Sequence, residues 1–147
     1  MTVRKIVISG GGTGGHLYPS LVVGQKLQEK DPQFQLTYIG SQRELEKRIM
    51  SQYGVKYISL KIEGIKGKGW RSLKSLVFLP FSFLKVLALL ARLRPHLVIG
   101  AGGYSSGPVV LLASLMKIPT LIMEQNVRPG VTNRLLARWA TRAVVAF

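Results

Sequence analysis

Residues 3–16 read VRKIVISGGGTGGH, a short apolar run followed by a loop with five glycines in six positions. A glycine gives up more backbone freedom on folding than any other residue, so a loop this rich in glycine needs a structural reason. A buried strand that runs into a glycine-rich turn and then a helix is typical of Rossmann-like domains, where the turn lets a ligand approach the backbone closely. The stretch therefore predicts an α/β domain with a ligand site directly after its first strand.

Six short apolar runs have the length of strands, and most are continuous rather than alternating, as in a parallel sheet covered on both faces. They lie at 3–8, 35–40, 55–60, 97–101, 119–124 and 143–147. Helix-length stretches separate them, at 15–30, 42–52, 72–94, 107–117 and 129–140. This alternation indicates right-handed crossovers. We expect one doubly wound, Rossmann-like parallel sheet over residues 1–147, with strand order 3-2-1-4-5-6.

Composition limits the chemistry. The chain carries 21 Lys and Arg against six Asp and Glu, a net charge of +15, which favours an anionic partner such as nucleic acid, an anionic membrane or a phosphorylated substrate. The lack of cysteine excludes thiolate catalysis and Cys-ligated zinc. Asp31 is the only aspartate, so no D-x-D metal motif exists and a glycosidase-type carboxylate pair is disfavoured. We expect neither a metal nor an organic cofactor.

A second glycine-rich turn, residues 100–107 with the sequence GAGGYSSG, follows the fourth predicted strand. In the expected strand order the first and fourth strands are neighbours at the point where the order reverses, which is where open parallel sheets bind ligands. Exposed N–H groups and helix N-termini make such a crevice a good anion site. The two loops therefore predict a site for a phosphate-bearing ligand, and tight strand-to-helix packing is the alternative without a ligand.

The common nucleotide motifs do not fit the first loop. Gly10, Gly12 and Gly15 satisfy G-x-G-x-x-G, but the second strand ends in YIGSQ without the acid that a dinucleotide site uses for the ribose hydroxyls. A P-loop needs Gly-Lys-Ser/Thr, and this loop has Gly-Gly-His. Half of a nicotinamide-dependent dehydrogenase is therefore a remote alternative.

Two polar clusters adjoin the loops. His16 stands at the start of the helix after the first strand, where the positive end of the helix dipole favours neutral imidazole, a possible general base for a hydroxyl. A purely structural role is the alternative, and it is the reading we prefer for His96 at the opposite edge. Glu124, Gln125 and Asn126 follow the fifth strand and can orient sugar hydroxyls, although Glu124 can equally brace a loop.

The stretch 61–94 has eight basic residues against one acid, Glu63, and is mostly apolar from 76 to 91. Sixteen helical residues reach only ~24 Å, short of the ~30 Å hydrocarbon core of a bilayer. An element that lies on the surface of an anionic membrane fits this length better. The alternative is a crossover helix whose apolar side packs on the sheet, and the two interpretations can hold for different faces of the same helix. Nucleic acid is not expected, because no helix-turn-helix, RNP-like or zinc-finger pattern is present. The predicted membrane patch comprises Lys66, Lys68, Trp70, Arg71, Lys74, Leu76, Phe78, Phe81 and Lys85.

Taken together, the motifs resemble one family. GGTGGH at 11–16 with Pro19, GGY at 102–104 with SGP at 106–108, and EQN at 124–126 with Gly130 and Asn133 are similar to the MurG family of glycosyltransferases. GIKGKG at 64–69 is similar to a further segment of that family. Members transfer N-acetylglucosamine from UDP-N-acetylglucosamine (UDP-GlcNAc) to lipid I, the undecaprenyl-diphosphate-linked muramyl-pentapeptide, giving lipid II for the peptidoglycan wall on which cell shape and division depend.

The resemblance implies the N-terminal, membrane-facing half of a metal-independent, inverting GT-B enzyme on the cytoplasmic face of the cell membrane. It implies that UDP-GlcNAc is a substrate rather than a cofactor, that the C-terminal donor-binding domain lies outside these 147 residues, and that this domain or a split partner chain is needed. By motif position, His16 is the candidate base, and the donor contacts are Thr13, Gly14, Gly15 and Asn126. The acceptor diphosphate would lie on Gly12, Gly102, Gly103, Tyr104, Ser105 and Ser106, with Glu124 and Gln125 in support.

A second class of function stays open on the sequence alone. The chain would then be a non-catalytic subunit that binds a lipid diphosphate or docks on a membrane, and recruits a separate donor-binding chain. No transfer is expected of the isolated chain without its partner, so transfer is to be measured with a C-terminal half supplied.

Overall fold

The computed structural model describes residues 3–61 and 70–146, and in the second stretch the side chains from Phe81 onward. Six strands form one sheet: β1 Arg4–Ser9, β2 Phe34–Ser41, β3 Tyr57–Leu60, β4 Leu97–Gly100, β5 Thr120–Glu124 and β6 Arg142–Val145. The helices between them are α1 Gly14–Lys30, α2 Glu44–Gln52, α3 Trp70–Leu93, α4 Ser106–Leu115 and α5 Val131–Leu136.

All five strand pairings are parallel, and the order is β3-β2-β1-β4-β5-β6. This confirms the predicted doubly wound sheet and its strand order. Ser9, the last residue of β1, pairs with Gly100, the last residue of β4. The loops that follow these two strands therefore leave the sheet side by side.

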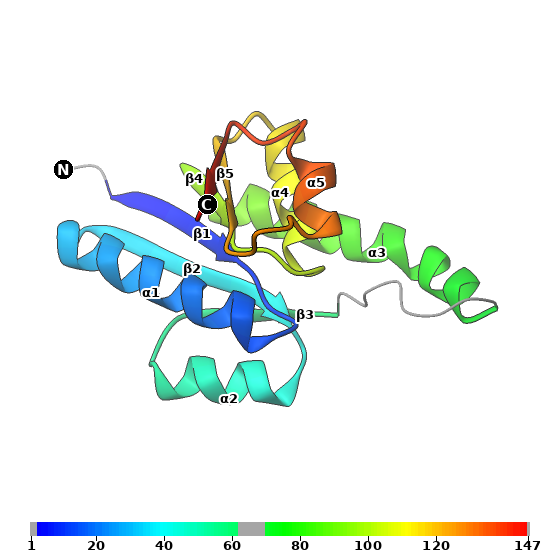
Figure 1. Ribbon diagram of the computed structural model, residues 1–147, viewed down its shortest axis with the longest axis horizontal. Helices are drawn as coiled ribbons and strands as arrows, with labels where there is room; N and C mark the ends of the chain where they lie inside the picture. The colour runs from blue at the N-terminus through cyan, green and yellow to red at the C-terminus, as the bar shows by residue number, and fades with distance from the viewer. Residues whose placement is uncertain (1–2, 62–69, 147) are drawn as a thin grey trace.

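Helices cover both faces of the sheet, α1 and α2 on one and α3, α4 and α5 on the other (Figure 1). Successive side chains of a strand point to opposite faces, and β1 shows the consequence. Ile6 and Ile8 pack with Leu17 and Leu21 of α1, whereas Val7 packs in the cluster that holds Leu90 of α3. Because both faces are buried, the strands read as continuous apolar runs rather than alternating ones.

The element ends differ from the sequence prediction by a few residues. The largest difference is at α5, which ends at Leu136 rather than at residue 140, and the chain then turns with Trp139 N–H and Ala140 N–H both donating to the Leu136 carbonyl. At the end of α3, Arg94 adopts a left-handed conformation with φ +48° and is followed by Pro95, which cannot continue a helix. The end of α5 was not readable from the apolar pattern, whereas the end of α3, predicted at residue 94, is observed at Leu93.

Candidate functional site

The two glycine-rich loops touch each other. A Cβ atom on Gly103 would overlap the Gly11 carbonyl oxygen, and one on Gly12 would lie 2.8 Å from the Tyr104 ring. Gly12 and Gly103 also have φ of +92° and +80°, in the left-handed region that glycine adopts without strain. The predicted convergence of the loops after β1 and β4 is therefore confirmed, and close approach of backbone to backbone explains part of their glycine content.

The contact region is rich in unpaired backbone N–H groups. Thr13 is the N-cap of α1, and its N–H and those of Gly14 and Gly15 stand at the helix start and donate no hydrogen bond within the described residues. Residues 102–105 of the second loop donate no backbone hydrogen bond within the described part of the chain. Oriented N–H groups of this kind form an anion-binding concavity.

His16 is tied to the second loop through one ring nitrogen. Its Nδ1 lies 3.1 Å from the Ala101 carbonyl oxygen, and the ring is half-buried. A carbonyl oxygen only accepts hydrogen bonds, so Nδ1 carries the proton and Nε2 keeps the lone pair. Gln125 Nε2 donates to the same carbonyl oxygen at 3.0 Å, which brings the third predicted cluster to the first two.

His96 lies at the opposite edge of the sheet. Its ring Nδ1 accepts a hydrogen bond from the Lys5 backbone N–H at 3.1 Å, and the His96 backbone N–H donates to the Lys5 carbonyl. These bonds join the start of β4 to β1, so the structural interpretation of His96 is confirmed.

Glu124 braces the loop that follows β5. Its buried carboxylate accepts hydrogen bonds from the Asn126 N–H and side-chain amide through one oxygen, and from the Gly130 N–H and the Asn133 side-chain amide through the other. Burial alone would raise the pKa of Glu124, but these bonds to its ionised form lower the pKa to about 2. Of the two predicted roles for Glu124, the structure supports the brace, with Asn126 held beside it and exposed.

Ser105 and Ser106 are fully buried within the second loop. The Ser106 hydroxyl donates to the Gly103 carbonyl at 2.9 Å, and the Ser105 hydroxyl oxygen is buried with no hydrogen-bond partner among the residues that the structure describes. Their side chains therefore shape the loop, and any contact of Ser105 with a ligand goes through its backbone N–H.

The sequence profile of the glycosyltransferase family 28 N-terminal domain matches residues 6–145. The chain belongs to glycosyltransferase family 28. It is 43% identical, over 100% of its length, to the UDP-N-acetylglucosamine--N-acetylmuramyl-(pentapeptide) pyrophosphoryl-undecaprenol N-acetylglucosamine transferase of Syntrophus aciditrophicus, and 42% identical to that of Myxococcus xanthus. It spans 41% and 38% of those proteins.

Solved structures agree with the family assignment. MurG of Acinetobacter baumannii superposes with a TM-score of 0.80 at 32% identity, over 98% of this chain and 42% of that one. A UDP-GlcNAc 2-epimerase of Neisseria meningitidis superposes with a TM-score of 0.67 at 16% identity, over 93% of this chain and 39% of its own, which shows a shared fold. The predicted resemblance to MurG is confirmed, and with it the fold class.

Sequence reasoning missed one residue that this family 28 chain places at the first loop. Glu46 of α2 is 3% exposed, and its carboxylate accepts hydrogen bonds from Gly12 N–H at 2.6 Å and Ser41 N–H at 2.9 Å. The Ser41 hydroxyl also donates to it at 2.7 Å, and the Tyr57 hydroxyl shares its single proton between this carboxylate, at 3.0 Å, and the Ser41 carbonyl oxygen, at 2.6 Å. The predicted diphosphate contact of Gly12 therefore cannot use its N–H, which is paired with a side chain.

A signal for Glu46 was present in the sequence. It lies three and four residues before Ile49 and Met50, the buried residues of α2, so an acid stands on the apolar face of the helix. An acid at such a position needs polar partners inside the fold. Which partners it finds depends on the loop after β1, and the sequence does not show that proximity.

The predicted membrane patch is described only in part. Lys66 and Lys68 lie outside the described residues, as do the side chains of Trp70, Arg71, Lys74, Leu76 and Phe78. Phe81 and Lys85 are both exposed, whereas Val86 and Leu90 on the other side of α3 are fully buried. The described part of α3 thus packs one apolar face in the core and exposes a second face to solvent. The predicted packing of this helix on the sheet is therefore observed for one of its faces.

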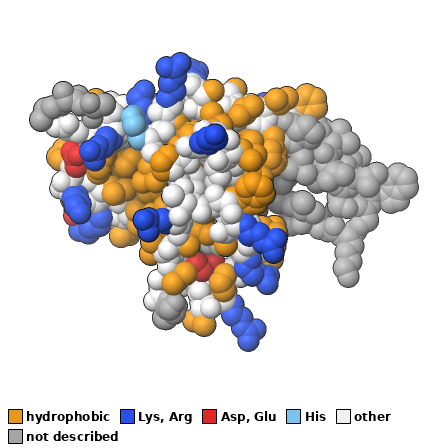
Figure 2. Space-filling model, turned by 90° about the horizontal axis from the view of Figure 1, so that it is seen from above, with side chains coloured by type: hydrophobic (Ala, Val, Ile, Leu, Met, Phe, Trp, Pro, Cys, Tyr) orange, Lys and Arg blue, Asp and Glu red, His pale blue; other side chains and the backbone are white. Residues whose placement is uncertain are grey.

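None of the helices in the described part of the chain is long and apolar enough to cross a membrane. On the face shown in Figure 2, most charged side chains are Lys or Arg, with hydrophobic side chains between them. The two ion pairs within the described residues, Lys26–Glu29 and Lys47–Glu44, are on the surface.

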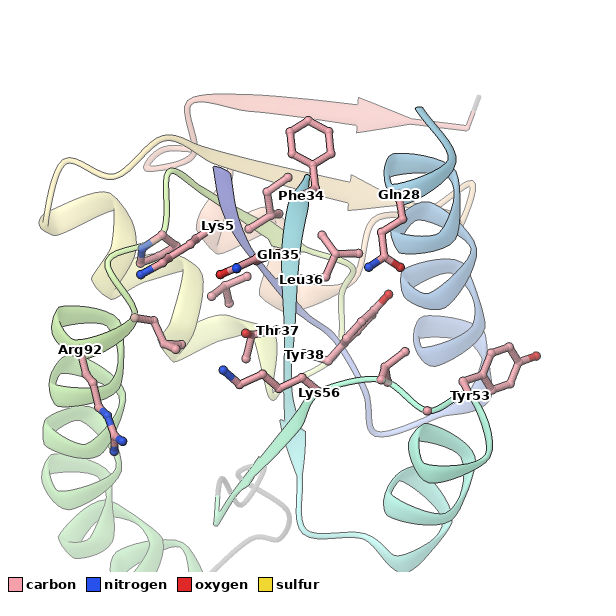
Figure 3. A pocket seen from close by; sticks show the side chains of 16 residues that line it. Lys5, Gln28, Phe34, Gln35, Leu36, Thr37, Tyr38, Tyr53, Lys56 and Arg92 are labelled. Atoms are coloured by element: carbon pink, nitrogen blue, oxygen red, sulfur yellow. The ribbon is translucent and has the colours of Figure 1, made fainter. Parts of the chain in front are cut away.

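A cavity of about 640 Å³ opens at the amino edge of the sheet, away from the glycine-rich loops. Gln35 and Thr37 point to one side of β2 and Leu36 and Tyr38 to the other, with Lys5, Lys56 and Arg92 around the first side (Figure 3). None of the predicted site residues lines it. Open parallel sheets bind their ligands at the carboxyl edge, so the glycine-rich loops, rather than this cavity, are the candidate functional site.

Proposed function

We propose that this chain is the acceptor half of a transferase that moves N-acetylglucosamine from UDP-GlcNAc to lipid I and yields lipid II. The observation that carries the proposal is the contact of two amide-rich loops beside His16, whose Nε2 is left free by the Nδ1 bond to the Ala101 carbonyl. The names of the relatives, which match this chain over its whole length, state the donor sugar and the pyrophosphoryl-undecaprenol acceptor.

In the proposed reaction the acceptor hydroxyl attacks the anomeric carbon of the donor sugar. A new carbon–oxygen bond forms, the bond to the diphosphate of UDP breaks on the opposite side, and UDP leaves with the electron pair. His16 Nε2 removes the proton from the attacking hydroxyl, which is general base catalysis. The Ala101 carbonyl holds the ring in the required tautomer, and Gln125 holds that carbonyl from its other side.

The backbone N–H groups supply electrostatic stabilisation. Those of residues 102–105 would bind the diphosphate of the acceptor, and those of Thr13, Gly14 and Gly15 would face the donor near its sugar and diphosphate, with Asn126 beside them. Preorganised N–H groups need no rearrangement as negative charge develops, so they stabilise the transition state more than water does.

The remaining parts of the proposed enzyme lie beyond this chain. It spans about two-fifths of the relatives it matches, so we propose that a C-terminal donor-binding domain or a partner chain supplies the rest of the UDP-GlcNAc site. We also propose a peripheral position on the cytoplasmic face of the cell membrane, with the exposed face of α3 toward anionic lipid. No cofactor is required by this chemistry.

The role of His16 is tested by measuring transfer to lipid I with this chain supplemented by the donor half of a relative. The substitution His16→Ala is expected to lower kcat by about 10²- to 10⁴-fold, the usual contribution of a general base, with little change in KM. His96→Ala is the matched control and should leave transfer unchanged, because His96 lies at the other edge of the sheet. Equal rates for the His16 variant and the wild type would reject His16 as the base.

A non-catalytic, membrane-docking subunit is the second candidate, and the exposed apolar face of α3 favours it. Phe81 and Leu84 are 62% and 61% exposed, with Lys85 next to them. Apolar side chains flanked by cations suit an interface with anionic lipid. Docking without transfer, even with a donor half supplied, would support this candidate.

A further inference from the structure

The carboxylate of Glu46 fills a space that would otherwise hold side chains of the neighbouring glycines. A Cβ atom on Gly11 would lie 2.6 Å from Glu46 Oε2, and one on Gly40 would lie 2.8 Å from the same oxygen. Real Cβ atoms do not approach other atoms so closely. Two glycines, one after β1 and one in β2, therefore lie against the carboxylate, and a Cβ atom on Gly40 would also lie 2.6 Å from the Tyr57 hydroxyl.

The four hydrogen bonds of Glu46 join three elements that are distant in sequence. Its partners come from the loop after β1, from the end of β2 and from β3. A buried carboxylate is costly unless its oxygens are satisfied, and here both oxygens accept two donors each. With this carboxylate in place, the first glycine-rich loop is held against the sheet at Gly12.

Arg43, one turn before Glu46, extends the same brace to the second loop. Its guanidinium donates to the Gly12 carbonyl and lies 5.8 Å from the centre of the Tyr104 ring. A guanidinium over an aromatic face is attracted by the ring quadrupole. Both polar groups of the Gly12 backbone are thus bonded to side chains of the α2 region.

We infer that Glu46 is a positioning residue for the diphosphate cradle, an inference that rests on the proposed function. By taking the Gly12 N–H, Glu46 sets the turn at φ +92° and leaves the next three N–H groups, those of Thr13, Gly14 and Gly15, unpaired beside residues 102–105. Glu46 itself touches no substrate. Its contribution is the position of the loop, since oriented amides bind an anion well only when they are held in place.

The test uses the chain with inorganic pyrophosphate as the probe, followed by the backbone amide shifts of Thr13–Gly15 and residues 102–105 in NMR spectra. In the wild type the shifts of these amide signals should change together as pyrophosphate is added and should reach a plateau when the site is saturated. Glu46→Gln keeps the shape of the side chain but replaces one acceptor oxygen by a donor, so pyrophosphate affinity should fall about tenfold. The Gly12 amide proton should also move upfield, because its short bond to a charged acceptor is lost.

Two further variants separate positioning from stability. Thr120→Val removes the hydrogen bonds of the Thr120 hydroxyl with the Thr141 N–H and hydroxyl and with the Ser114 hydroxyl, so it should lower the melting temperature without changing the affinity. Gly11→Ala pushes the carboxylate away from Gly12 while its charge is kept, and should weaken pyrophosphate binding as Glu46→Gln does. It also replaces the Glu46 variant if that protein does not fold.

The outcomes distinguish this inference from the proposed function. Unchanged pyrophosphate affinity in both the Glu46 and Gly11 variants overturns the positioning role and leaves the diphosphate cradle standing. An equal loss of affinity in Thr120→Val also overturns it, because any destabilisation would then suffice. If the wild-type amides do not respond to pyrophosphate, the cradle itself is refuted, and the inference with it.

Discussion

Replacing Glu124 by Gln should destabilise the chain at neutral pH and have little effect in acid. Gln has the shape of the protonated acid, so the substitution removes the ionised carboxylate that accepts bonds from Asn126, Gly130 and Asn133. The pKa of Glu124 is lowered from 4.5 to about 2, and one pH unit corresponds to about 1.4 kcal/mol, which sets an upper limit of about 3 kcal/mol. Because exposed residues of the loop admit solvent, which screens these interactions, we expect about 2 kcal/mol.

The pH dependence follows from the direction of the shift. A carboxyl whose pKa is lower in the folded chain than in the unfolded one stabilises the fold in its ionised form. Its contribution is complete above about pH 5 and disappears as the pH falls through 4.5 towards 2. The difference in unfolding free energy between wild type and Glu124→Gln should therefore shrink from its neutral value towards zero across this window.

Urea unfolding, followed by circular dichroism between pH 7 and pH 3, measures this difference. Glu44→Gln is the matched control, because the Glu44 side chain is 88% exposed and pairs with Lys47 on the surface. The control should differ from the wild type by less than about 0.5 kcal/mol throughout. A Glu124→Gln difference that stays constant from pH 7 to pH 3 would refute the reasoning, since a loss that does not track protonation cannot come from the charge.

Two other substitutions test the packing with matched pairs, each by thermal or urea unfolding. Gly103→Ala should lower the free energy of unfolding by about 3 kcal/mol, because the backbone is left-handed and the new Cβ atom would overlap Gly11. Gly54→Ala should lower it by only about 1 kcal/mol, because Gly54 has φ +61° but no atom lies within 4 Å of the new Cβ atom. Equal losses would show that the two loops do not touch. Leu90→Ala should lower the free energy of unfolding by about 3 kcal/mol, because it leaves a cavity in the core. Leu84→Ala, on the exposed face of α3, should lower it by less than about 0.5 kcal/mol. A larger loss for Leu84→Ala than for Leu90→Ala would mean that the buried and exposed faces of α3 are exchanged.

The arrangement of the elements was accessible from the sequence because it depends on patterns that are local. Continuous apolar runs of strand length, separated by helix-length stretches, leave only a few doubly wound orders when crossovers are right-handed, and 3-2-1-4-5-6 is a common one. The strand order predicted in this way is the observed one, and it brings the loops at Gly11 and Gly103 together. The element ends at α5 and β3 were less accurate, because turns depend on tertiary hydrogen bonds.

The candidate site was predictable where a motif follows a strand and hidden where it depends on contacts across the fold. His16 and the glycine-rich loops stand at the carboxyl ends of β1 and β4, a location set by topology. Which nitrogen of His16 is free was not readable, because the Ala101 carbonyl that bonds Nδ1 is 85 residues away in sequence. The same holds for Glu46, whose partner Gly12 belongs to another crossover unit.

By itself, the amino-acid sequence determined the class of fold, the strand order, the family and the edge of the sheet that holds the candidate site. The reason is that hydrophobic periodicity and the positions of motifs can be read from the sequence alone. Only the tertiary structure decided which glycines lie against another loop and which against a buried carboxylate, and whether Glu124 reaches outward or braces its own loop. The physical reason is that a hydrogen bond or a close approach is a matter of a few tenths of an ångström between distant segments, and that distance exists only once the chain has packed.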